Sequence, residues 1–258
     1  MGFAFWQSDA AGCYEASLAF ASATHGSGGD QMAQEIGRIS RPAAEQYQGR
    51  RKLLLVPLVY GPPTGEPEGV TVLQEYWDQV QAQVTSLESA LGGLRHIYHE
   101  SVPAGGQEGL DHLERVDERS HRFVKAKCES GATLEATEDG GLLAEILDLQ
   151  RCLMLPLISG KVAQQLQYWF TESSRGRYEH ISKQIDATLG DNETGLLLVS
   201  ERHQIQFPAD IEVFYVSPPA LDEFRRWLQE WITRQQGPLE VASEEESEEP
   251  PAEPEAEE

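Results

Sequence analysis

The chain has 258 residues and a formal net charge of −23, from 20 Lys and Arg against 43 Asp and Glu. Ten glutamates lie between Leu239 and Glu258, and the rest of the chain still has 33 acids against 20 bases, or −13. An acidic body argues against DNA as a partner, because nucleic-acid affinity depends on cations that neutralise phosphates. It also argues against docking on an anionic membrane. The composition excludes collagen, a coiled coil and a disulfide-stapled miniprotein.

The three cysteines, Cys13, Cys128 and Cys152, are odd in number and widely spaced, without a CxxC pair. This pattern predicts neither a disulfide framework nor a zinc ribbon. We expect free thiols in a reducing compartment. The chain has no run of 18 apolar residues, so no membrane-spanning helix is predicted. The apolar N-terminal stretch lacks the basic region of a signal peptide, and the cytoplasm is the expected location.

Both ends of the chain are predicted to lie outside the folded domain. Residues 1–51 are expected to form a partly flexible extension, because Gly26–Asp30 is a flexible breaker. Met32 follows this breaker, so the true start is either Met1 or Met32. Residues 237–258 are predicted to be a disordered acidic tail, since Glu244–Glu258 holds no aromatic residue and buries too little to offset its chain entropy. The domain is expected over residues 52–236.

In chain order, the first predicted strand is the continuous apolar run 53–60, in which Pro57 suggests a bulge or an edge strand. A helix is expected over 73–91, with a capping box formed by Thr71 and Gln74. Gly92 and Gly93 end this helix, and a second strand is predicted over 94–102.

The second half of the domain continues the alternation. A helical region over 108–128, a short strand over 132–137 and a helix that ends at Pro156 are predicted. The longest helix is expected over 161–189, capped by Ser159, with a kink or break at 173–176. Strands 196–199 and 211–216 precede a last helix that starts near Pro218. Strands alternating with helices predict a three-layer α/β domain with a largely parallel sheet.

Polar side chains follow two of the predicted strands. Glu100 ends the second strand beside His99, and Glu201 and His203 follow strand 196–199. Because sites in open α/β sheets lie beyond the carboxyl ends of the strands, these groups could meet at one edge. Carboxylates and imidazoles suit a divalent metal or general acid–base catalysis. The alternative interpretation is that they are solvated polar groups at loop ends.

Other motifs give few functional signals. No GxGxxG, GxxxxGK[ST] or GxSxG motif occurs, so neither a nucleotide-binding loop nor a serine nucleophile elbow is predicted. Arg175, Arg177 and Lys183 could form a local basic patch or simply a solvated helix face. Four aromatic residues are expected in the core rather than at a cofactor: Tyr168, Trp169, Phe170 and Trp227.

The stretch from Arg175 to Asp186, followed by Glu193–His203, resembles the TraB/PrgY/GumN (Tiki-like) family. In that family an arginine-bearing helix leads into a strand that ends in a GxxH motif, and the position of Glu100 also looks similar. The resemblance implies a metal-dependent hydrolase, but Ser200 replaces the glycine of GxxH. The family's first GxxH, expected after Tyr60, is missing. A fainter likeness connects the chain to the C-terminal domain of archaeo-eukaryotic release factors and Pelota.

The sequence therefore favours a non-enzymatic cytoplasmic binding or regulatory protein, with an unidentified protein or small-molecule partner and no cofactor. One alternative is a metal-dependent hydrolase of the TraB-like type, which would use a divalent metal with Glu100, Glu201 and His203. In this alternative, Arg175 or Arg177 would orient an anionic substrate. Another alternative is a ribosome- or translation-associated factor. The oligomeric state is left open by the sequence.

Overall fold

The structure is a computed structural model that describes residues 49–61 and 66–236. Residues 1–48 of the predicted extension, the acidic tail, Cys13 and the choice between Met1 and Met32 lie outside these residues, whereas Arg51, the last residue of that extension, belongs to the first strand. The elements in chain order are β1 Arg51–Pro57, α2 Pro67–Leu91, β2 Leu94–His99, α3 Gly106–Val116, α4 Glu118–Glu129, β3 Thr133–Leu134, α5 Gly140–Leu153, α6 Gly160–Thr188, β4 Thr194–Val199, β5 Ile211–Tyr215 and α7 Pro219–Gln236.

The five strands form one sheet in the order β3-β2-β4-β1-β5, and every neighbouring pair is parallel. In the middle of the sheet, Leu196 of β4 is aligned with Leu54 of β1 on one side and with Ile97 of β2 on the other. All six residues of β4 are buried, which is typical of a parallel strand covered on both faces. The predicted parallel α/β sheet is therefore confirmed.

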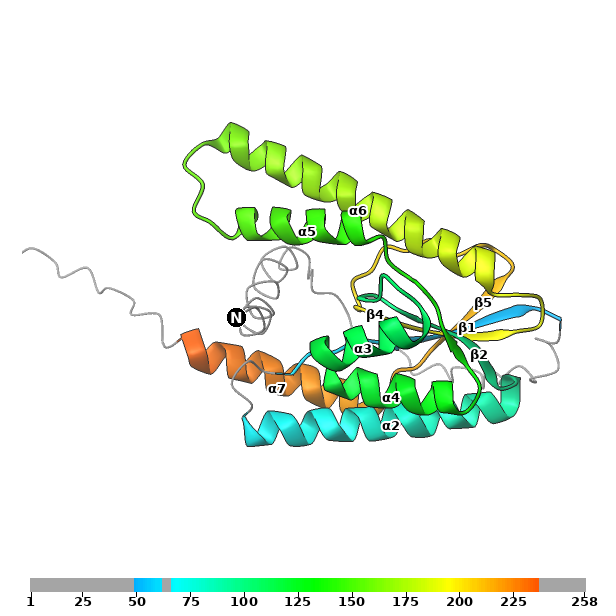
Figure 1. The fold of residues 1–258 in the computed structure, drawn as a ribbon. Helices are drawn as coiled ribbons and strands as arrows, with labels where there is room; N and C mark the ends of the chain where they lie inside the picture. The colour runs from blue at the N-terminus through cyan, green and yellow to red at the C-terminus, as the bar shows by residue number, and fades with distance from the viewer. Residues whose placement is uncertain (1–48, 62–65, 237–258) are drawn as a thin grey trace, which may run out of the picture.

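Each face of the sheet packs against its own layer of helices, which gives three layers (Figure 1). Leu54, Val56 and Leu198 point into the larger core, together with apolar residues of α2, α3, α4 and α7. Leu53, Leu55 and Leu197 point to the opposite face, where Ile181 and Ile185 of α6 cover them. Side chains alternate between the two faces because successive residues of a strand point in opposite directions.

Helix α2 and helix α7 approach closely beside the sheet. The indole ring of Trp227 lies over Gly69, so that a Cβ atom at position 69 would stand 2.2 Å from the ring. Both residues are buried. This contact requires a glycine for its size alone, because any side chain would have to displace a buried indole.

One predicted helix boundary is wrong, and one predicted helical region consists of two helices. Helix α2 begins at Pro67, six residues before the predicted start, and the Thr71 hydroxyl donates a hydrogen bond to the Pro67 carbonyl at 2.9 Å inside the helix. The capping box therefore does not form, and Pro67 supplies the helix start. The predicted helical region 108–128 is divided at Asp117, whose carboxylate accepts a hydrogen bond from the Arg119 amide and caps α4.

Two further expectations are also wrong. Helix α6 runs unbroken from Gly160 to Thr188, and segment 173–176 lies inside it, packed against neighbouring elements. Ser173 there is buried, and Gly176 faces Leu142 of α5. Pro57 lies at the end of an inner strand rather than on an edge, and its carbonyl accepts a hydrogen bond from the hydroxyl of Tyr76.

No helix within the described ranges is long and apolar enough to cross a membrane. Cys128 and Cys152 are unpaired thiols, the first half-buried and the second exposed.

Candidate functional site

At the carboxyl edge of the sheet, connections from neighbouring strands leave toward opposite faces. The connection after β1 and the connection after β2 cross the face covered by α2, α3 and α4, whereas the connection after β4 carries Ile205 and Phe207 to the opposite face. Strand β4 lies between β1 and β2. At the carboxyl end of β4, its connection therefore leaves toward one face of the sheet, while the connections of both neighbouring strands leave toward the other face. Such a switch point is where ligands bind in open α/β sheets.

Glu100, the residue that follows β2, lies at this switch point and is 5% exposed. One of its carboxylate oxygens lies 3.4 Å from the hydroxyl of Tyr60, which follows β1. Burial raises the pKa of Glu100, while Arg177 and hydrogen bonds from Ser200 act in the opposite direction. Glu100 thus contacts Ser200, the residue that follows β4.

Arg177 of α6 reaches the same edge from the other face of the sheet. Its guanidinium donates to both carboxylate oxygens of Glu138, with Nε 2.9 and 3.0 Å from them, and Nη2 lies 3.6 Å from Glu100. The side chain of Glu138 is completely buried. Burial acts to lower the pKa of Arg177, but Glu138 outweighs it, so the pKa lies above its ordinary value. The two carboxylates thus share one buried cation.

The other predicted site residues are held elsewhere. Glu201 forms a bidentate ion pair with Arg225 of α7 at the surface. His203 is half-buried against Phe207, and its Nδ1 accepts a hydrogen bond from the Ile205 amide at 3.3 Å.

Arg175 is exposed and pairs along its own helix with Glu172 and Glu179. Of the five predicted site residues, the structure joins Glu100 with Arg177, whereas Glu201, His203 and Arg175 each contact other groups.

Sequence reasoning missed Glu138 and Tyr60. Tyr60 ends the first apolar run, and Glu138 follows the short strand β3, so the rule that placed Glu100 at the carboxyl edge also applies to both. No group of three or more His, Cys, Asp or Glu side chains in segments 49–61 and 66–236 is arranged to hold a metal ion.

His99 lies beside Glu100 and is completely buried. Neither of its ring nitrogens has a hydrogen-bond partner among the described residues. Burial, with a smaller contribution from His112, lowers the pKa of His99 to about 3. The imidazole of His99 is therefore buried in its neutral form.

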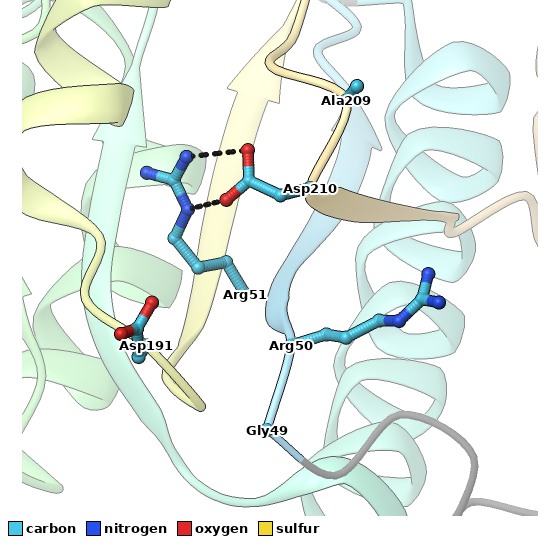
Figure 2. A pocket seen from close by; sticks show the side chains of 6 residues that line it. All are labelled: Gly49, Arg50, Arg51, Asp191, Ala209 and Asp210. Carbon is cyan, nitrogen blue, oxygen red and sulfur yellow. Dashed lines mark hydrogen bonds and ion pairs between the residues drawn. The ribbon is translucent and has the colours of Figure 1, made fainter.

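The opposite, amino edge of the sheet has an open hollow of about 430 Å³ (Figure 2). Arg51, at its wall, donates to both carboxylate oxygens of Asp210, at 2.7 and 2.9 Å. The same guanidinium donates to the carboxylate of Asp186 at 2.8 Å and to the carbonyl of Leu189. Because carboxylates and carbonyls of the chain already occupy this guanidinium, the hollow is not a built anion site.

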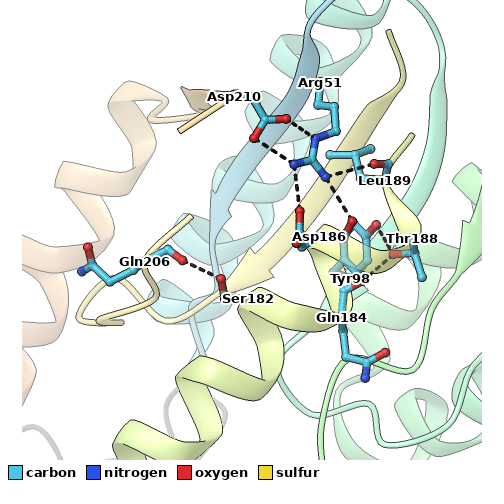
Figure 3. Close-up of polar contacts among 9 residues, drawn as sticks. All are labelled: Arg51, Tyr98, Ser182, Gln184, Asp186, Thr188, Leu189, Gln206 and Asp210. Carbon is cyan, nitrogen blue, oxygen red and sulfur yellow. Dashed lines mark hydrogen bonds and ion pairs between the residues drawn. The ribbon is translucent and has the colours of Figure 1, made fainter. Parts of the chain in front are cut away.

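These contacts fasten the second half of α6 to the sheet (Figure 3). Arg51 of β1 binds Asp186, the Tyr98 hydroxyl of β2 lies 2.6 Å from that of Thr188, and the Ser182 hydroxyl donates to the Gln206 carbonyl. The first half of α6 lacks such anchors to the sheet within the described residues, and none of its side chains before Ser173 is buried. It projects from the body with α5 packed along it (Figure 1).

The end of this α5–α6 hairpin exposes large apolar side chains. Six of the eight large hydrophobic residues that are exposed in the described chain lie there. We call this set the tip surface: Met154, Leu155, Ile158, Val162, Tyr168 and Trp169. The prediction that Tyr168 and Trp169 are core residues is wrong, because α5 covers only one side of α6 and both side chains are exposed. Trp227 is buried as predicted, and Phe170 is half-buried.

Comparisons of the chain with protein-family models, curated proteins and solved structures found no match. The resemblance to the TraB/PrgY/GumN family therefore stays a prediction.

Proposed function

We propose that this chain is a non-enzymatic binding protein that engages a protein partner through the tip surface of the α5–α6 hairpin. The observation that carries the proposal is the concentration of exposed large apolar residues at that one place. Exposed apolar residues scattered singly are ordinary, but a cluster on one projecting element is typical of an interaction site.

The anchoring of α6 supports this proposal. Asp186, Thr188 and Ser182 hold the base of the helix to three separate parts of the body, so the projecting half is the extension of a fixed element. A rigid element loses less conformational entropy when it binds than a loop does. The hairpin thus presents its apolar residues in an arrangement formed before the partner arrives.

The carboxyl edge supports catalysis less well. An anionic substrate that needed Arg177 would have to compete with Glu138, whose side chain is fully buried and holds two hydrogen bonds from that guanidinium. Breaking a buried ion pair costs several kcal/mol, about 3–5. Glu201, a predicted catalytic residue, faces Arg225 instead of Glu100.

Site-specific photo-crosslinking tests the proposal. Benzoylphenylalanine replaces Tyr168 in one variant and Tyr215 in another. Both tyrosines are exposed, but Tyr215 lies on the edge strand β5, which is the rival docking place. We expect adducts in cells from position 168 and none from position 215. Equal labelling at both positions, or none at 168, would contradict the proposal.

One observation favours the metal-dependent hydrolase as the second candidate. Burial raises the pKa of Glu100, and the Tyr60 hydroxyl lies beside it at the switch point, as a general acid at neutral pH would require. Metal analysis of protein purified without chelator separates the two candidates. Stoichiometric zinc, manganese or iron that is lost in His203→Ala would favour the hydrolase, whereas the binding protein is expected to hold no metal in either form.

A further inference from the structure

We infer that the partner of the tip surface is a second copy of this chain, joined through a two-fold pairing of α5–α6 hairpins. This inference rests on the proposed function and names the partner. In such a dimer the same surface of each copy contacts its equivalent on the other. Two antiparallel hairpins then pack as a four-helix arrangement, the usual way in which a pair of helices buries an apolar side.

Charge is the first argument for a second copy. The chain carries −23, or −13 without its tail, so two copies repel each other over most of their surfaces. Residues Leu149 to Thr171 form the longest run of the chain without an Asp or Glu, and they include the cations Arg151 and Lys161. This run contains the whole tip surface. The hairpin tip is thus the part of the described chain where two acidic copies can approach with the least repulsion.

Area is the second argument. Ile158 is fully exposed, and the other five residues of the tip surface are between 48% and 62% exposed. With about 200 Å² for a large side chain, the six residues expose on the order of 700 Å² in each copy, of which Tyr168 contributes about 100 Å² on another side of α6, about 100° around the helix from Trp169. A stable interface takes about 800 Å² from each partner, whereas the largest apolar patch of an ordinary monomer is about 300–600 Å². The tip surface is therefore close to the size that self-association requires.

The arrangement of the side chains fits such a pairing. Val162 and Trp169 are seven residues apart and share one side of α6. Ile158, Leu155 and Met154 continue the apolar surface around the end of the hairpin. Half-buried residues on the neighbouring side of α6, Leu166 and Phe170, mark the seam with α5. The exposed side of α6 thus lies next to the side that contacts α5, and a second hairpin can pack against this exposed side.

Sedimentation equilibrium of the full chain over a range of concentrations tests the inference. Wild type is expected to reach twice the mass of one chain. Ile158→Asp is expected to raise the dissociation constant at least about tenfold, because each copy would bring a charge into an apolar interface. The matched control is Tyr215→Asp, which places the same charge on the exposed edge strand and is expected to leave the constant unchanged. Ile158 makes no buried contact, and circular dichroism verifies that both variants fold.

Salt distinguishes the apolar interface from an ionic one. Added sodium chloride screens the repulsion between the acidic bodies, so the dimer is expected to tighten or stay unchanged. A dimer weakened by salt would instead indicate attraction between the acidic tail and cations such as Lys161, and would overturn the inference. So would a single-chain mass at every concentration, or a dimer that survives Ile158→Asp.

The outcomes also separate this inference from the proposed function. A crosslinked adduct at position 168 whose mass is not twice that of the chain, together with a monomeric purified protein, would overturn the second copy and leave the binding function standing. The absence of any adduct at position 168 would overturn the binding function itself.

Discussion

The side chains at the carboxyl edge of the sheet and at the tip of the α5–α6 hairpin differ in burial and in polarity. At the edge, Glu100 and Glu138 are buried, and both form ion pairs with the largely buried guanidinium of Arg177. At the tip, residues such as Ile158 and Trp169 are apolar and exposed. A buried charge network resists a ligand that must break it, whereas an exposed apolar cluster gains free energy when a partner covers it. The buried network at the edge therefore stabilises the fold, and we propose that the exposed tip is the part that binds a partner.

The largest expected effect lies at the edge. Arg177→Met leaves the carboxylate of Glu138 buried without its cation, and we expect the free energy of unfolding to fall by about 3–5 kcal/mol. Urea unfolding measures the loss. Arg175→Met on the same helix is the control, since the exposed Arg175 pairs with the exposed Glu172, and it should change stability by less than about 0.5 kcal/mol. Similar losses in both variants would remove the distinction between buried and surface charges.

The free energy of unfolding should also depend on pH through His99. Its pKa in the fold is lowered to about 3 from 6.5, so the unfolded chain takes up the proton first as the pH falls. The stability that depends on neutral His99 is complete above pH 6.5 and is lost as the pH falls from 6.5 toward 3. Between pH 7 and 5, His99→Leu should lose less stability than wild type, by up to about 2 kcal/mol.

Urea unfolding of both proteins across this pH range measures the difference. Glu100 has a raised pKa and contributes in the opposite direction, its stabilisation being lost as the pH rises. Because Glu100 is present in both proteins, its contribution largely cancels. Parallel stability curves for wild type and His99→Leu would contradict the burial of a neutral His99.

Glycine-to-alanine substitutions should destabilise the protein where the glycine is closely packed, at Gly69, but not at Gly160 at the hairpin tip. Gly69→Ala drives a methyl group into the buried ring of Trp227, and overpacking of this kind costs about 1–3 kcal/mol, partly offset by the better helix propensity of alanine. Gly160→Ala at the start of α6 meets no atom within 4 Å and should be neutral or slightly stabilising. Thermal unfolding of both variants measures the contrast. A loss at Gly160 equal to that at Gly69 would mean that the hairpin tip is covered in the single chain.

The smallest expected effect is on the stability of the hairpin tip itself. In dilute protein, Ile158→Asp should change the free energy of unfolding by less than about 0.5 kcal/mol, because Ile158 is fully exposed. Ile181→Ala on the same helix, where the side chain is buried against the sheet, should cost about 2–5 kcal/mol. Both values come from chemical unfolding. A large loss for Ile158→Asp would show that this residue packs within its own chain.

The sheet was predictable because buried strands such as 196–199 are continuous apolar runs, and such runs occur where a parallel sheet is covered on both faces. Helix boundaries were less predictable, since Pro67 and Asp117 act through local backbone geometry that apolar periodicity does not contain.

The carboxyl edge was predictable only in part. The end of a strand places Glu100, but the partner of Arg177 depends on how α6 crosses the sheet, and Glu138 lies 39 residues away in sequence. The tip surface was not predictable, because Val162 and Trp169 have the spacing of core residues. Their exposure results from the absence of a further layer of helices over this side of α6 among the described elements.

Amide hydrogen exchange of wild type and Ile158→Asp, at the same high concentration, shows whether a second copy covers the hairpin tip. Peptides from the tip, residues 153–171, should exchange more slowly in wild type, and peptides around Glu100 should exchange equally in both. An added aspartate near the start of α6 favours the helix dipole and would by itself slow exchange in the variant, so the expected difference cannot come from local helix stability. Equal exchange at the tip, or a difference confined to the carboxyl edge, would contradict the claim that a second copy covers the hairpin tip.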